Sequence, residues 1–145
     1  SCTDMRYCSA EAYFTIKEID IGMVADVGTL QRLPKLIGNQ GIVREMAFTG
    51  RKVEAAEAQA IGLVNRVFDT REALYAGVHE LAQQVAAKSP LSIRGTKEML
   101  NYSRDHSVED GLKYIATWNA AMLMSSDLMT AMMAHMSKQT PQFKD

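Results

Sequence analysis

The sequence predicts an α/β protein whose strands and helices are unevenly divided along the chain. Short runs rich in aromatic and β-branched residues, typical of strands, occur at residues 5–8, 12–16 and 63–68. After residue 69 only helical patterns remain. Two or three short strands do not bury their faces unaided, so we expect further strands, from a preceding part of the protein or from another subunit, to complete the sheet.

Glycine and proline punctuate the first half of the chain. Asp26 and Thr29 are both placed to cap a short helix, Pro34 opens a further turn, and Gly62 stops an alanine- and glutamate-rich helix. The predicted order of elements is a loop at 22–28, a short helix to 33, a turn, and helices over 40–48 and 53–61.

Capping signals divide the second half into helices. Ser89 followed by Pro90 is an N-cap with proline at the first helical position. Residues 107–110 approximate a capping box, and Ser126 with Asp127 is expected to cap the last helix. These signals predict helices over 70–88, from 90 onward, over 107–124 and over 126–137. The chain therefore joins an α/β segment, residues 1–68, to a helical segment, residues 69–145.

Composition excludes several classes of protein. The chain has 145 residues, 47% hydrophobic and 23% charged, enough for about one domain with a sizeable core. Its formal net charge of −1 gives no general attraction to nucleic acid or to an anionic membrane. No apolar run approaches the roughly 18 residues of a membrane span. Cys2 and Cys8 lack the spacing of a zinc site, so no metal is expected there.

Two carboxylates eight residues apart, Glu18 and Asp26, are the candidate catalytic residues. Both stand in an apolar, glycine-punctuated stretch. A carboxylate in such a place is either satisfied locally or held there to transfer a proton. Spacing alone leaves both readings open, because Asp26 also suits a helix cap and Glu18 a solvated strand end.

Two motifs connect the chain to a known family. The stretch Thr49-Gly50-Arg51-Lys52-Val53-Glu54-Ala55-Ala56-Glu57-Ala58, running on to residues 62–67, resembles the crotonase (enoyl-CoA hydratase/isomerase) superfamily, as does Gly28-Thr29-Leu30-Gln31-Arg32-Leu33. Residues 102–107 and 114–119 resemble its dienoyl-CoA isomerase branch. The resemblance covers essentially the whole chain and implies the C-terminal portion of a crotonase-like ββα spiral with an all-helical oligomerisation segment.

The resemblance implies roles for the two acids. Glu18 matches the superfamily's second acid position and Asp26 the extra acid of the dienoyl isomerases. The implied reaction turns a 3,5-dienoyl-CoA into a 2,4-dienoyl-CoA in the β-oxidation of unsaturated fatty acids. No metal or separate cofactor is expected, because CoA is part of the substrate. The first family acid and the oxyanion segment would precede Ser1, so we expect this fragment alone to be inactive.

The helical segment carries the remaining implications. In the family a lysine at the position of Lys138 helps to hold the CoA phosphates, although a solvated helix-end lysine is an equal alternative. The methionines near the C-terminus suit a core or a subunit face, and the resemblance implies a homotrimer or homohexamer with an acyl-CoA as the partner molecule. The ending is not a peroxisomal Ser-Lys-Leu, and we expect a mitochondrial location.

Two other functions compete with the isomerase. The first is an enoyl-CoA hydratase of the same superfamily, which needs room for a water where Asp26 would project. The second is a helical oligomerisation module without catalytic activity, which predicts that Asp26→Asn leaves every activity unchanged.

Overall fold

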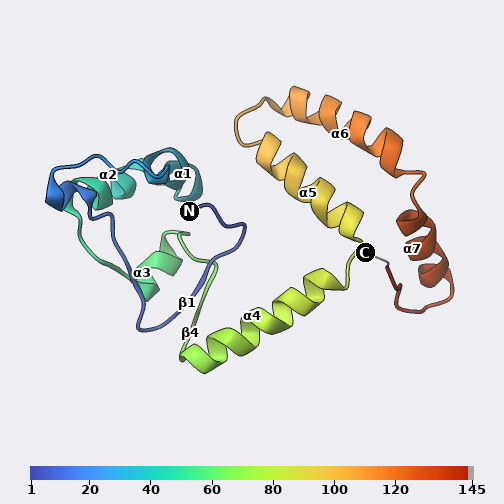
Figure 1. The fold of residues 1–145 in the computed structure, drawn as a ribbon, viewed down its shortest axis with the longest axis horizontal. Helices are drawn as coiled ribbons and strands as arrows, with labels where there is room; N and C mark the ends of the chain where they lie inside the picture. Colours follow the sequence, from blue (N-terminus) through green and yellow to red (C-terminus); the bar gives the residue numbers. More distant parts are fainter. Residues whose placement is uncertain (144–145) are drawn as a thin grey trace. The chain divides into compact units, whose positions relative to one another are not determined.

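The computed structural model describes residues 1–143 and separates into two compact units, Ser1–His79 and Glu80–Asp145. Figure 1 traces the elements in both units. The boundary between the units falls inside a helix, α4 (Arg71–Ala86). The functional division predicted at residues 68 and 69 stays a prediction.

Four short strands form two small ladders in the first unit. Strand β1 (Tyr7–Ser9) pairs in parallel with β4 (Arg66–Phe68), and Cys8 lies opposite Val67. Strand β2 (Tyr13–Phe14) pairs antiparallel with β3 (Val53–Glu54). Each ladder has two strands. The expectation that further strands complete the sheet stays a prediction.

Short helices link these strands. They are the 3₁₀ helix η1 (Glu18–Ile21) and the α-helices α1 (Thr29–Leu36), α2 (Gln40–Thr49) and α3 (Ala55–Ala60). The side chain of Asn39 caps α2 by accepting hydrogen bonds from the amides of Gly41, at 2.9 Å, and Ile42, at 3.3 Å. Gly50, with φ at 59°, ends that helix in the left-handed conformation that glycine adopts without steric cost.

The hydrophobic core lies in the first unit. Ile37, Met46 and Val53 are its largest fully buried side chains, and each is at most 1% exposed. The other buried apolar residues come from the strands, the helices and the loop before α1: Cys8, Ile16, Ala25, Leu33, Val43, Ala55, Ala58, Leu63 and Val64. Residues far apart in the sequence therefore meet in one cluster, which fixes the loops between them.

The second unit is helical over its described length. It contains the end of α4 and three further helices, α5 (Pro90–Tyr102), α6 (Val108–Met122) and α7 (Ser126–Met136). The predicted caps at Ser89 and Ser107 are confirmed, since each hydroxyl accepts an amide hydrogen bond at 3.1 Å. The cap of α7 is Ser125, one residue before the prediction, while Asp127 accepts a 2.5 Å hydrogen bond from Ser89.

Two predicted boundaries in the first unit are wrong. Pro34 lies inside α1 and does not open a separate turn, because a proline in the last turn of so short a helix removes a single amide bond. Val53 and Glu54 pair with β2 as a strand, so α3 begins at Ala55. Pairing with a distant segment overrides the local helical pattern there.

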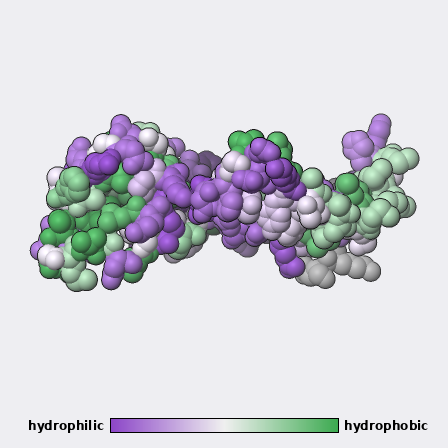
Figure 2. Space-filling view, turned by 90° about the horizontal axis from the view of Figure 1, so that it is seen from above, coloured by the Kyte–Doolittle hydropathy of each residue, from purple (hydrophilic) through white to green (hydrophobic). Residues whose placement is uncertain are grey.

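Hydrophobic surface is also exposed on the first unit. Figure 2 shows hydrophobic residues between hydrophilic ones on the face of the N-terminal unit that it presents. Its exposed large apolar residues include Tyr13, Ile21, Val24, Val27 and Phe48, each more than half exposed. Among residues 1–143, none of the helices is both long enough and apolar enough to cross a membrane.

Candidate active site

Glu18 is the first residue of η1 and follows β2, which ends at Phe14, after a three-residue connection. The turn closes when the amide of Met23 donates to the Glu18 carbonyl at 2.9 Å, and Gly22, with φ at 74°, ends it. The Glu18 side chain is half-buried. Its backbone is thus fixed by a hydrogen-bonded turn, a suitable support for a side chain that transfers a proton.

Asp26 lies in the loop between η1 and α1. Its neighbour Ala25 is buried at 6% exposure, whereas Asp26 is exposed between the apolar side chains of Val24 and Val27. The predicted capping role is wrong for both Asp26 and Thr29. Helix α1 begins at Thr29 with Gly28 at the cap position, and no side chain bonds to the free amides. Gly28 has φ at 82°, a left-handed conformation unlike the extended backbone of a side-chain cap.

The segment from Glu18 to Gly28 carries both predicted acids. It connects β2 to α1 and is anchored by Ile16 and Ala25, both 6% exposed. Its other apolar side chains are largely exposed: Ile19, Ile21, Met23, Val24 and Val27. Two carboxylates surrounded by apolar surface suit an apolar substrate that exchanges protons at two carbons.

Asp20, a third acid near Glu18, has a partner. The Lys17 ammonium lies 2.7 Å from Asp20 Oδ2, and a Cβ at Gly50 would lie 3.1 Å from Asp20 Oδ1. The hydroxyl of Thr15 also donates to the Gly50 carbonyl at 2.8 Å. These contacts connect the turn that carries Glu18 to the end of α2.

Arg32 is the residue of this region that sequence reasoning did not single out as functional. Its guanidinium donates to the Val27 carbonyl at 2.5 Å and packs over Gly28. The signal in the sequence was a glycine four residues before an arginine, an i to i+4 spacing that brings the two onto one helix face.

Lys138 stands just beyond α7, in the second unit. It is exposed, and its φ of 54° is the one positive value at a non-glycine residue among residues 1–143. Its amide donates to the His135 carbonyl at 3.2 Å, so the residue closes the end of the helix. Glu18 and Asp26 both belong to the first unit, eight residues apart in the sequence, and Lys138 belongs to the second. Their predicted roles stay predictions.

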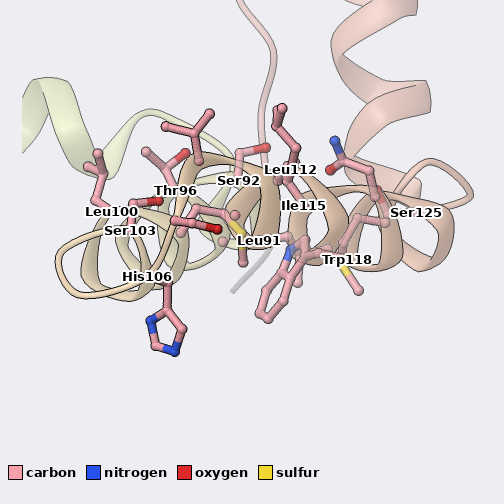
Figure 3. Close-up of a pocket in the computed structure, with 17 residues that line it drawn as sticks. Leu91, Ser92, Thr96, Leu100, Ser103, His106, Leu112, Ile115, Trp118 and Ser125 are labelled. Atoms are coloured by element: carbon pink, nitrogen blue, oxygen red, sulfur yellow. The ribbon is translucent and has the colours of Figure 1, made fainter.

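A cavity with a volume of about 580 Å³ lies elsewhere, between α5 and α6. Figure 3 shows Leu91 and Leu100 from α5 and Leu112, Ile115 and Trp118 from α6 along it. Neither predicted acid lines it. Within the described part of the chain, no three His, Cys, Asp or Glu side chains gather as a metal site would require.

Comparison with known proteins identifies the family. The enoyl-CoA hydratase/isomerase family matches residues 1–145, the whole chain. The chain belongs to this family. The chain has the crotonase-type α/β fold. Its structure is similar to that of an enoyl-CoA hydratase from Bacillus anthracis, with a TM-score of 0.92 and 28% sequence identity. The match covers 97% of the chain and 54% of the hydratase.

Curated relatives carry more specific names. A protein of Mus musculus named Delta(3,5)-Delta(2,4)-dienoyl-CoA isomerase, mitochondrial, is 50% identical over 96% of the chain and 42% of its own length. A protein of Arabidopsis thaliana with the same activity name, peroxisomal, is 49% identical over 97% of the chain and 50% of its own length. The chain spans about half the length of these relatives.

Proposed function

We propose that the protein containing this chain isomerises 3,5-dienoyl-CoA thioesters to 2,4-dienoyl-CoA thioesters. The observation that carries the proposal is the segment from Glu18 to Gly28, where Asp26 has no capping role and stands among apolar side chains with Glu18 on the same stretch. The names of relatives about 50% identical to the chain support the same reaction.

The reaction needs one proton removed and one delivered. A base removes a proton from the carbon next to the thioester, the two double bonds each shift by one carbon toward the carbonyl, and an acid protonates the far carbon of the original diene. The substrate is neither oxidised nor reduced, so two carboxyl groups suffice. We assign Glu18 to the thioester-proximal carbon and Asp26 to the distal carbon. Donors for the developing enolate oxygen complete the site.

The experiment uses the natural protein that carries this chain and follows absorbance of the conjugated dienoyl thioester formed from a 3,5-diene. We expect Asp26→Asn and Glu18→Gln each to lower kcat by about 10² or more, since proton transfer by a positioned side chain contributes about that factor. Asp20→Asn is the matched control, because its carboxylate is paired with Lys17 outside the proposed relay. An unchanged rate in Asp26→Asn rejects its catalytic role, whereas absence of any isomerisation by the wild-type protein favours the non-catalytic module.

A hydratase is the second candidate, because solved structures similar to the chain include enzymes named enoyl-CoA hydratase. Exposure of Asp26 leaves room for water beside it. Hydration of crotonyl-CoA at a rate comparable with diene isomerisation would support this candidate. A rate at least about 10² lower, the contribution of one proton-transferring group, would reject it.

The helical segment is proposed to bind the CoA phosphates and to assemble subunits. Lys138 is exposed at a helix end, which suits an anion contact. We expect Lys138→Met to raise KM several-fold while kcat is kept. Large exposed methionines, Met124 at 87% and Met136 at 81%, suit an interface in a homotrimer or homohexamer. Sedimentation of the natural protein tests this, and a monomer at micromolar concentration would reject it.

A mitochondrial location is proposed from the name of the Mus musculus relative, with the peroxisomal name of the Arabidopsis thaliana relative as the alternative. Imaging of the natural protein in its own cells, with markers for both organelles, decides between them.

A further inference from the structure

We propose that Arg32 is a positioning residue for Asp26, an inference that rests on the proposed function. Arg32 lies in the first turn of α1, four residues after Gly28. Through its side chain it holds the backbone of the loop in which Asp26 stands.

The contact that carries the inference is made to the residue directly after Asp26. One terminal nitrogen of the Arg32 guanidinium donates to the Val27 carbonyl at 2.5 Å. A hydrogen bond from a charged donor is about twice as strong as one between neutral groups. The Arg32 side chain is half-buried, while the bond itself lies at an exposed position of the loop.

Gly28 makes the close approach possible. A Cβ built on Gly28 would lie 2.8 Å from Arg32 Cζ, closer than real Cβ atoms come to other atoms. Glycine at this position therefore serves two purposes, since it adopts a φ of 82° and leaves room for the guanidinium. A methyl group at Gly28 would therefore displace the flexible Arg32 guanidinium from its place beside the Val27 carbonyl.

The loop around Asp26 has few other anchors. Ala25 is buried on one side of Asp26, and the nearest backbone bonds run from Met23 to Glu18 and from Arg32 to Gly28. Asp26 thus stands between the buried methyl group of Ala25 and the carbonyl held by Arg32. A catalytic carboxylate displaced by about 1 Å loses up to about 10² in rate, so this support matters for the proposed reaction.

The principal test is a double-mutant cycle of Arg32→Met and Asp26→Asn in the natural protein. Methionine keeps the apolar stem of arginine but donates no hydrogen bond. We expect Arg32→Met to lower kcat about tenfold or more while KM stays within about twofold of the wild-type value. In the Asp26→Asn background, the same change should alter kcat less than about twofold. A stability effect alone would lower the rate equally in both backgrounds, and that result would overturn the inference.

Lys35→Met is the matched control, because it removes a cation from an exposed position of the same helix. A second pair of variants tests the inference if Arg32→Met fails to fold. Gly28→Ala adds backbone strain and a clash with Arg32, whereas Gly62→Ala adds similar strain at φ 78° with its nearest neighbour, the Leu36 carbonyl, at 3.8 Å. We expect kcat to fall at least tenfold further in Gly28→Ala than in Gly62→Ala, and equal losses would contradict the inference.

Hydrogen exchange separates this inference from the proposed function. Arg32→Met should speed amide exchange across residues 23–28 at least about tenfold, while Lys35→Met leaves it unchanged. Unaltered exchange overturns the role of Arg32 whatever the enzyme catalyses. If the wild-type protein shows no isomerisation, the proposed function fails, and the exchange result alone then decides whether Arg32 holds the loop.

Discussion

The two units differ in how their apolar side chains are covered. In the first unit, Ile37, Met46 and Val53 are fully buried by strands and helices from across residues 8–64. In the second, the described helices bury no large apolar side chain, and Leu112, Met124 and Met136 are each more than 60% exposed. The first unit is stabilised by its own interior, and the predicted acids lie on it. The second leaves large apolar side chains exposed, and we propose that a subunit interface covers them.

The largest expected effect comes from the core of the first unit. Ile37→Ala should reduce the free energy of unfolding of that unit by about 2–5 kcal/mol, because it leaves a cavity in a close-packed interior. Leu112→Ala in the second unit is the control, since its side chain is 63% exposed. Urea-dependent hydrogen exchange, read at amides of residues 37–64 for Ile37→Ala and at amides of α5 and α6 for Leu112→Ala, measures each loss. Similar losses in both variants would contradict the contrast between the units.

The next effect concerns the packing of Gly95 in α5 against Trp118 in α6. A Cβ at Gly95 would lie 2.6 Å from Trp118 Nε1, so Gly95→Ala should push α5 and α6 apart. Overpacking of this kind costs about 1–3 kcal/mol. Trp118 is the single tryptophan of the chain, so its fluorescence during urea unfolding reports on this unit. An unchanged midpoint would mean that the helix pair adapts without loss.

A smaller effect is expected from pH in the first unit. Arg51 hydrogen-bonds Glu57, with guanidinium nitrogens 2.6 and 2.9 Å from its carboxylate oxygens, and holds the pKa of that carboxyl below its usual value of 4.5. A lowered folded-state pKa stabilises the protein above the unfolded-state pKa, and this contribution is lost as pH falls through the folded-state value. The urea midpoint should therefore fall as pH drops below about 4.5, and less steeply in Glu57→Gln. Parallel pH profiles would reject this role for the pair.

The smallest effect is expected at the exposed methionines. Met136→Ser should change the free energy of unfolding of a monomeric chain by no more than about 0.5 kcal/mol, since its side chain is 81% exposed. In the natural protein the same change should weaken the proposed self-association, as seen by sedimentation at several concentrations. A large loss of stability in the monomer would show that the residue packs within its own unit.

Local signals in the sequence determined much of the second half. Ser89-Pro90 and Ser107 begin helices where they were expected, because capping depends on atoms within one turn. A local signal also predicts where α2 ends, because Gly50 adopts the left-handed conformation that stops the helix. The family was also readable, from the motifs at residues 28–33 and 49–67.

The tertiary structure decided the rest. Residues 53 and 54 became a strand because they pair with Tyr13 and Phe14, almost forty residues earlier, a contact that no local pattern contains. The capping alternative for Asp26 was removed by the left-handed backbone of Gly28, and the importance of Arg32 emerged from its reach to Val27. Side-chain chemistry and helix ends follow from neighbours along the chain, whereas strand pairing and the support of a loop depend on distances that only folding sets.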